Sequence, residues 1–413
     1  MDRTTCCVVG GGPAGMMLGL LLARAGIEVT VLEKHGDFLR DFRGDTVHPS
    51  TLNLLDDLGL GAEFARLPFR KLEEMRIQVG GTTVVMADMR RIPGRHKYFA
   101  MVPQWDFLNL LAGAAAREPS FTLRMRTRAT GLRTGGGRVT GVRYTDEHGA
   151  PGELAADLVV ACDGRDSAIR AAAGLRQRYT DVPMDVWQIR VDAPADALKG
   201  GRVFGRFGGG QAAVTMDRGT YFQTSYLIGK GQDAALRRHD IQWLRDRLGT
   251  LFGWDAAVTG TIASWDEVKL LEVTFGRLPR WHRPGLLCLG DAAHTMSPVG
   301  GVGVNLALQD AVAAARILAG PLRRTAVTGA DLARVQRRRE WPMAVVQASQ
   351  RGEHEMIRSA LDGTLHGDRL PVPMRLLRRV PPLRTVTGYL GGIGIRPEPT
   401  PDFARVSPGA RRR

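Results

Sequence analysis

The sequence has few cysteines and few lysines, and it lacks a long apolar run. Its four cysteines each lie in a short apolar stretch typical of a buried strand, without the spacing of a disulfide framework or a metal site. The longest apolar run near the start, residues 16–23, is too short to cross a bilayer and has neither a basic flank nor a cleavage site. These absences predict no metal, no transmembrane segment and a reducing, cytoplasmic setting.

The excess of positive charge does not identify a nucleic-acid partner. The net charge is +15 and the pI is about 10.4, but the basic residues are spread along the chain and only six of the 57 are lysines. No nucleic-acid-binding motif accompanies them, so we expect no such partner. The 413 residues, 44% hydrophobic and 24% charged, suggest two or three globular domains with a substantial core.

The first 33 residues carry the clearest motif. An apolar strand at residues 5–9 runs into the stretch GGGPAG, an apolar helix follows, and a second strand at residues 27–32 ends at an acidic residue. This βαβ pattern predicts dinucleotide binding, with the glycines allowing a tight turn, a close pyrophosphate and close helix packing. The helix N-terminus favours the phosphates. The residues expected to bind the cofactor here are Gly10, Gly12, Pro13, Ala14, Gly15 and Glu33.

Two later strands also end in glycine-bearing turns. Residues 154–161 lead into CDGRDS, and residues 286–289 lead into GDAAHTMSPVGGVGVNLALQDA. In an open parallel sheet the carboxyl ends of the strands gather at one crevice, so the three turns can converge on one long ligand. FAD needs several such contacts, whereas NAD would be satisfied by the first unit alone.

These three motifs, in this order and spacing, resemble those of the single-component (class A) FAD-dependent aromatic monooxygenases, the relatives of para-hydroxybenzoate hydroxylase and the ubiquinone-pathway hydroxylases. The resemblance implies an α/β fold: a Rossmann-like FAD-binding domain, an inserted antiparallel-sheet substrate domain and a C-terminal helical segment. It also implies FAD, with NAD(P)H docking transiently; no histidine or cysteine is placed as an obvious flavin attachment point, so we expect the FAD to be noncovalent. One oxygen atom from O2 would then pass through a flavin C4a-hydroperoxide to an aromatic or polyketide-like small molecule. We expect a monomer or homodimer.

The resemblance also assigns roles to positions in this sequence. Asp291 would bind the ribityl and pyrophosphate part of FAD, and residues 300–305 would wrap the pyrimidine end of the ring. A helix predicted at residues 306–319 would point its N-terminus at the flavin atoms that become anionic on reduction. The assigned cofactor residues are Arg43, Gln104, Asp163, Gly164, Asp291, Pro298, Gly300, Gly301, Val302, Gly303, Val304 and Asn305.

Several of these positions have alternative explanations. Asp163 could instead cap a helix over residues 167–172, and Arg43 and Gln104 could be surface residues that open helices. His294 follows Asp291 closely and invites a general-base role, but the resemblance places it near the cofactor phosphates. No catalytic residue is identified; the candidates for substrate contact are Asp45, His48, Tyr221 and Gln223.

The motifs divide the chain into a discontinuous FAD-binding domain and a substrate domain. The first takes residues 1–70, 97–180 and 272–330; the second takes residues 71–96 and 181–271. The expected helical segment covers residues 331–400, broken by prolines after 370, and residues 401–413 are an expected disordered tail. In the substrate sheet, strand alternation puts Tyr221 and Gln223 on one face and Phe222 and Tyr226 on the other. Which face lines the pocket stays open, as it does for Trp187, Arg190 and Phe204.

Three other activities fit the same scaffold. They are epoxidation or Baeyer–Villiger insertion, flavin dehydrogenation or reduction, and non-catalytic binding on an FAD fold. A flavin halogenase is disfavoured because the chain has no Trp-x-Trp-x-Ile-Pro stretch.

Overall fold

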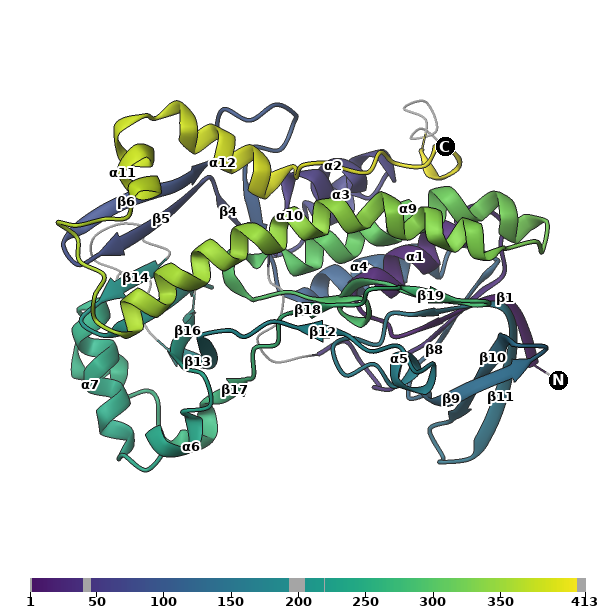
Figure 1. Ribbon diagram of the computed structural model, residues 1–413, viewed down its shortest axis with the longest axis horizontal. Coiled ribbons are helices and arrows are strands. Elements are labelled where there is room, and N and C mark those ends of the chain that lie inside the picture. The colour runs from purple at the N-terminus through teal and green to yellow at the C-terminus, as the bar shows by residue number, and fades with distance from the viewer. Residues whose placement is uncertain (1, 40–45, 193–204, 219, 407–413) are drawn as a thin grey trace.

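The fold was analysed in a computed structural model that describes residues 2–39, 46–192, 205–218 and 220–406. Two sheets lie toward opposite ends of the molecule, and the long helix α10 (Gly329–Leu361) runs from one to the other (Figure 1). The predicted α/β class, with an FAD-type domain, an antiparallel-sheet domain and a C-terminal helical segment, is confirmed.

The first sheet is built on parallel strands in the order β20-β11-β1-β2-β8. Hydrophobic side chains fill these strands because helices cover the sheet, and Cys6, Cys7 and Cys288 are buried among them. The strands are β1 (Asp2–Val9), β2 (Val29–Leu32), β8 (Phe121–Arg124), β11 (Pro151–Ala161) and β20 (Leu286–Cys288), with β19 (His282–Arg283), β9 (Arg128–Gly135) and β10 (Arg138–Thr145) added antiparallel.

Helices α1 (Pro13–Arg24), α4 (Gln104–Ala115) and α9 (Gly303–Arg323) form the core around this sheet. Helix α1 packs against both α4 and α9, and α9 also packs against α10. Among the described residues, the helical stretch 299–323 is long and apolar enough to cross a membrane, but 72% of its apolar window is buried inside the protein. Its apolar character is therefore accounted for by the core.

The second sheet has seven strands in the order β17-β13-β16-β15-β14-β5-β6. Its chain pairings are antiparallel except for β14 with β5. One face packs against α7 (Ile241–Phe252) through aromatic side chains, and the other lies toward α10. The strands are β5 (Glu74–Val79), β6 (Thr82–Asp88), β13 (Met184–Asp192), β14 (Gly205–Gly208), β15 (Gln211–Asp217), β16 (Tyr221–Gly229) and β17 (Lys269–Leu271). Strands β5 and β6 thus join the strands from residues 184–271, although the domain boundaries themselves stay a prediction.

The C-terminal region differs from the sequence expectation in two ways. Its prolines start helices rather than only ending them, because proline suits the first helical turn: α11 is Val372–Arg379 and α12 is Pro382–Gly392. The tail also packs where disorder was expected. The Val406 N–H donates to the carbonyl of Asp57 and Ala404 is buried. Residues 407–413 lie outside the described residues.

Short elements complete the chain. They are α2 (Pro49–Asp57), α3 (Gly61–Phe64), α5 (Ala168–Ala172), α6 (Asp233–Leu236), α8 (Ala256–Thr259), β3 (Thr46–Val47), β4 (Arg70–Leu72), β7 (Phe99–Met101), β12 (Arg178–Tyr179), β18 (Gly276–Arg277), β21 (His294–Thr295), and the 3-10 turns η1 (Trp265–Glu267), η2 (Gly290–Ala292), η3 (Val299–Gly301) and η4 (Asp402–Ala404).

Candidate active site

Three adjacent strand ends form one edge of the first sheet. The Cys162 N–H donates to the Val9 carbonyl at 2.7 Å, and the Leu289 N–H donates to the Ala161 carbonyl at 2.9 Å. These bonds continue the ladder past the ends of β1, β11 and β20. The three glycine-bearing turns therefore lie side by side, as their positions after parallel strands predict.

The glycines of the first turn differ in what surrounds them. A Cβ on Gly10 would lie 2.4 Å from the Cys162 carbonyl oxygen, and a Cβ on Gly15 would lie 1.9 Å from the Gly10 carbonyl oxygen. A Cβ on Gly12 would meet nothing within 4 Å. The fold itself thus needs Gly10 and Gly15, whereas Gly12 borders the open space in front of the α1 N-terminus, with Pro13 and Ala14 beginning that helix.

Glu33 follows β2 and is buried against the same turn. Its Oε2 accepts from the Gly11 N–H at 2.8 Å, and its Oε1 accepts from the His35 N–H at 3.0 Å. A carboxylate can accept about four hydrogen bonds, so Glu33 can hold the glycine turn and still accept from ribose hydroxyls.

The start of α9 lies beside the third of these turns. The helix begins at Gly303, three residues earlier than predicted, which places Val304 and Asn305 in its first turn. The N–H groups of a first turn have no partner within the helix and can serve a ligand. The preceding turn after Pro298 needs glycine, because Gly300 and Gly301 have φ of +76° and +63°; Val302 caps the helix.

Two contacts hold the start of α9 in place. The Asn305 Oδ1 accepts from Ser50 Oγ at 3.0 Å and from Thr51 Oγ1 at 2.8 Å, which anchors it to α2. Gly290 lies between the two helices, since a Cβ placed on it would be 3.5 Å from the Cβ of Ala14 in α1 and 3.1 Å from that of Ala307 in α9. The N-termini of α1 and α9 therefore meet at the turn that carries Asp291.

His294 belongs to a buried ionic cluster behind that turn. Its Nε2 lies 2.6 Å from Asp310 Oδ2, and the Arg339 Nε donates to Asp310 Oδ1 at 3.0 Å. The Gly290 N–H also donates to Asp310, at 3.3 Å. Burial acts to raise the pKa of Asp310, but His294 and Arg339 hold that pKa below its ordinary value. The cluster supports the cofactor turn from behind, so the geometry gives His294 a structural place and not that of a general base.

Asp163 caps a helix. Its Oδ2 accepts from the Ile169 N–H at 3.2 Å, its Oδ1 accepts from the Ser167 hydroxyl, and burial raises its pKa above the ordinary value. The helix-cap explanation therefore describes its carboxylate in this structure, while contact with FAD or NAD(P)H stays a prediction. Gly164 beside it has φ of +86° and open space around it.

His48 lies close to the predicted ring site but is fully engaged. Its Nδ1 is 2.8 Å from the Gly391 carbonyl oxygen and its Nε2 is 3.0 Å from that of Gly301, and its ring lies edge-on to Phe99. Burial lowers its pKa below the ordinary value. His48 therefore links the glycine turn to α12 instead of facing a substrate. The other candidates from this segment, Arg43 and Asp45, lie outside the described residues.

A hollow of about 460 Å³ opens between the start of α4 and the second sheet. Tyr221 and Gln223 line it, so the face of β16 that carries these two residues is the one that faces the hollow and α4. The Arg190 guanidinium lies 4.1 Å from the Tyr221 ring centre, and Arg218 donates to Gln223 Oε1 at 2.8 Å. The lining residues are Pro103, Trp105, Arg190, Asp192, Arg218, Tyr221, Gln223, Thr261, Asp266, Glu267 and Lys269.

The opposite face of the second sheet is core. Phe222, Tyr226 and Trp187 are buried in the cluster against α7, so Trp187 and Tyr226 are packing residues rather than pocket residues. Phe204 lies outside the described residues. Sequence reasoning missed Trp105 and Arg218, although Trp105 directly follows Gln104, the first residue of α4. An aromatic residue beside an assigned cofactor contact was the signal available.

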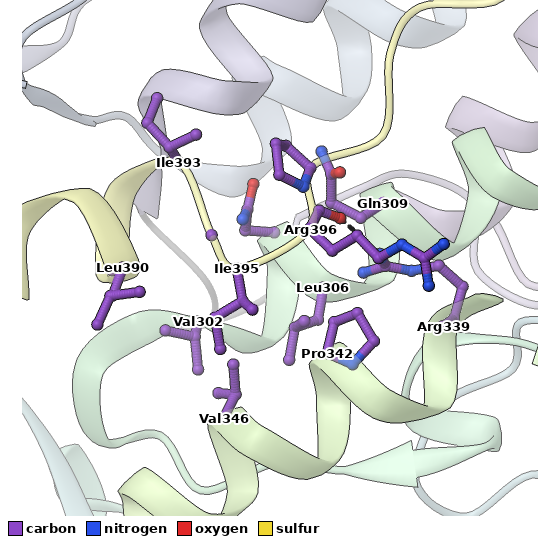
Figure 2. A pocket seen from close by; sticks show the side chains of 14 residues that line it. Val302, Leu306, Gln309, Arg339, Pro342, Val346, Leu390, Ile393, Ile395 and Arg396 are labelled. Carbon is purple, nitrogen blue, oxygen red and sulfur yellow. Dashed lines mark hydrogen bonds between the residues drawn. The ribbon is translucent and has the colours of Figure 1, made fainter. Parts of the chain in front are cut away.

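A second, smaller cavity lies behind the start of α9, between α9, α10 and residues 390–397 (Figure 2). Val302, Leu306, Pro342 and Val346 make much of its wall apolar, and Arg339 lies at one end. Its volume of about 30 Å³ is near that of one water molecule, so it is too small for a cofactor.

Comparisons with known proteins agree with this geometry. The family model described as the FAD binding domain matches residues 3–349. The chain is 35% identical over 325 residues to 6-methylpretetramide 4-monooxygenase from Streptomyces rimosus, covering 78% of this chain and 77% of that protein. The solved structure of the anhydrotetracycline hydroxylase from Streptomyces rimosus superposes with a TM-score of 0.75 at 25% identity, covering 95% of this chain and 76% of that one.

The fold alone does not determine the reaction. The structure of a Diels-Alderase from the biosynthetic pathway of pyrroindomycins matches with a TM-score of 0.77 at 22% identity, covering 97% of this chain and 82% of that one. At this identity the match shows only that the fold is shared. The function therefore has to be inferred from the site and from the more similar relatives.

Proposed function

This chain belongs to the FAD-binding-domain family and is an FAD-dependent monooxygenase, and from that premise we propose that it hydroxylates a fused-ring phenolic polyketide. The proposal rests on one observation above all: a hollow that is both aromatic and charged lies between the start of α4 and the second sheet. Its volume falls in the range of sites for drug-sized ligands, about 300–1,000 Å³.

The residues present fit FAD. Open space in front of Gly12 and the first-turn N–H groups of α1 and α9 suit a pyrophosphate at one end and an anionic ring edge at the other. We propose that Glu33, Asp291 and Gln104 hold the ribose, ribityl and chain portions, with Arg43 and the residues from Pro298 to Asn305 at the ring. When bound, FAD supplies electrons taken from NAD(P)H and activates O2 for transfer of one oxygen atom.

The protein's own tasks are to orient the substrate and to exclude water. Trp105 and Tyr221 offer flat surfaces on which a fused aromatic system can stack. Gln223 is mostly buried and is held by Arg218, so it can direct a hydrogen bond toward a ring hydroxyl or carbonyl. Excluding water matters because water in the site would release H2O2 instead of transferring oxygen.

The relatives support the substrate class. Two of them are a monooxygenase of 6-methylpretetramide and a hydroxylase of anhydrotetracycline. We propose a related multi-ring compound here, without assigning the ring position.

We further propose a cytoplasmic enzyme that is a monomer or homodimer. The four cysteines are free thiols, and three of them are buried, as expected of a reducing compartment. Fractionation of producing cells and light scattering of the purified protein would check location and subunit number; a membrane-bound or larger species would contradict this proposal.

The proposed function is tested by oxygen and NAD(P)H consumption with a panel of one-, two-, three- and four-ring phenols, including anhydrotetracycline. We expect three- and four-ring phenols to stimulate NAD(P)H oxidation most and to be hydroxylated with little H2O2. Equal stimulation by one-ring phenols, or oxidation that yields only H2O2, would contradict the proposed substrate class.

A further inference from the structure

Helix α10 lies along the loop that leads to the flavin turn. The Gln347 Nε2 donates to the Gly276 carbonyl at 3.1 Å. One turn later, the Gln350 Nε2 donates to the carbonyls of Ser297 and Val299 at 2.9 and 2.7 Å. This face of α10 therefore positions the backbone immediately before Gly300.

Glu353 continues the same face but has no such partner. Its Oε2 is closed off from solvent and has no hydrogen-bond partner among the described residues. That atom lies 3.7 Å from the position that a Cβ on Gly300 would occupy. An unpaired buried carboxyl oxygen costs stability, so packing alone does not account for a glutamate at this place.

Among the described residues, no cationic side chain forms an ion pair with Glu353. Turn η3 carries no titratable side chain. On the strands that α10 crosses, the Arg206 guanidinium lies over Phe252, on the α7 side of the sheet. Asp217 pairs with Arg70. Strand β16 adds two tyrosines, and β19, which contacts α10 near Gln336, consists of His282 and Arg283. On α10 itself, burial lowers the pKa of His354, which keeps its ring neutral near pH 7.

Burial is the cause that raises the pKa of Glu353, to about 7. A carboxyl group with this pKa changes protonation near the pH at which such enzymes work, which is what a general base requires.

Glu353 lies on the same side of the second sheet as Gln223, the side that faces α10. Gln223 and Leu227 lie on the same face of β16, and Leu227 packs in one cluster with Ile357, one turn beyond Glu353 on α10. Four strand residues span about 13 Å, comparable with the length of a fused four-ring system. A long aromatic substrate that extends from Gln223 along this face of β16 would approach α10 near Glu353.

We propose that Glu353 is the proton acceptor for the substrate's phenolic hydroxyl. The O–H bond of the phenol breaks, the proton passes to the Glu353 carboxylate, and the products are a phenolate and a neutral carboxyl group; no oxidant or reductant takes part. The phenolate is more electron-rich than the phenol and is better suited to receive an electrophilic oxygen. This inference rests on the proposed function, because it assumes a phenolic substrate.

The test compares Glu353→Gln with the matched control Glu355→Gln, whose side chain is exposed two residues along the same helix. Infrared difference spectra of the FAD-loaded enzymes, without any phenol, should show a carboxyl band that disappears with a midpoint near pH 7. We expect the band in the wild type and in Glu355→Gln but not in Glu353→Gln.

The second readout uses alizarin, a three-ring phenol whose visible spectrum reports its ionisation. Bound to the wild type and to Glu355→Gln, it should become phenolate as the pH rises through about 7; bound to Glu353→Gln, it should keep its solution pKa. A wild type without the infrared band, alizarin that does not bind, or unchanged alizarin ionisation in Glu353→Gln would overturn the proposal. If Glu353→Gln does not fold, the wild-type infrared titration still decides whether the group exists.

The two proposals fail in different ways. If no fused-ring phenol is hydroxylated but the infrared band and the alizarin shift are present, the substrate class is wrong and Glu353 remains a proton acceptor. If hydroxylation occurs but its rate does not rise with pH through about 7 in the wild type, or Glu353→Gln keeps that rise, the role of Glu353 is wrong and the proposed function stands.

Discussion

The edge of the first sheet where β1, β11 and β20 end is the expected flavin site, and it differs in kind from the face of the second sheet that lines the hollow. At the first, the groups that would meet a ligand are backbone N–H groups and glycine turns after β1, β11 and β20. At the second, they are side chains such as Tyr221 and Gln223, whose orientation depends on how the sheet packs against α7.

The difference suggests how such a scaffold can keep one cofactor and change its substrate. Backbone donors at helix N-termini are tied to the fold, since altering them means altering the helix or the turn. Side chains on a sheet face can be exchanged with little effect on the strand ladder. The following variants test whether the two regions are as separable as this comparison implies.

The largest effect should come from Gly15→Val. Its Cβ would lie 1.9 Å from the Gly10 carbonyl oxygen, and backbone cannot move aside cheaply there, so we expect a loss of at least about 3 kcal/mol of stability or no folded protein. Gly12→Ala is the matched control: its Cβ meets nothing within 4 Å, and we expect an unchanged melting temperature but weaker FAD binding. Measuring melting temperature and FAD content together checks both; a stable Gly15→Val would contradict the role given to this packing.

His294→Ala should destabilise the protein by about 1.5–3 kcal/mol, because it removes one hydrogen-bonding partner of a buried carboxylate that keeps Arg339 as its other partner. The loss should appear in urea unfolding, while any enzyme that remains folded with FAD retains turnover. His148→Ala, at an exposed histidine, should change nothing. A stable His294→Ala enzyme that holds FAD but has no activity would instead show that His294 acts in catalysis.

Asp291→Ala should weaken FAD binding by about 10–100-fold, the effect of losing a hydrogen bond to a charged group. We expect the purified variant to be colourless at FAD concentrations that saturate the wild type, with nearly unchanged secondary structure. Titration with FAD, monitored by flavin fluorescence, gives the affinity. Asp402→Ala, at an exposed aspartate near the C-terminus, serves as the control, and equal FAD affinity in both variants would refute the assignment.

Tyr221→Ala should have the smallest effect and should fall on the substrate side alone. It removes an aromatic wall of the hollow and the partner of Arg190, so we expect KM for a fused-ring phenol to rise about 10-fold, equivalent to about 1.4 kcal/mol. FAD content should not change. The control is Tyr179→Ala, at an exposed tyrosine; a loss of FAD in Tyr221→Ala would mean that the two regions are not separable.

The sequence predicted the three glycine-bearing turns and their arrangement well because its signals are local. Glycine at positions 10, 12 and 15, and an acidic residue after the next strand, each follow from the conformation of a few neighbouring residues. That the turns carrying Gly10, Asp163 and Asp291 come together followed from the rule that parallel strand ends gather, whereas the order of the strands is seen only in the structure. Even so, the start of α9 was placed three residues late, because the turn at Gly300 and Gly301 tightens directly into the helix.

Features that depend on contacts between distant segments were not predictable. Asp310 and Arg339 meet His294 only through the packing of α9 against α10. Glu353 looked like any other acidic residue of an arginine-rich helix, and only burial beside Gly300 distinguishes it from Glu355. Similarly, the inward face of β16 could not be chosen until α7 was seen to cover the other face.

The central claim is that this protein transfers one oxygen atom from O2 to a fused-ring phenol. The most direct test is a turnover of the FAD-loaded enzyme with NADPH, anhydrotetracycline or another fused-ring phenol, and isotopically labelled O2, followed by mass spectrometry of the product. We predict one labelled oxygen atom in each product molecule. A product without label would contradict the claim and would leave a dehydrogenase or reductase on the same fold.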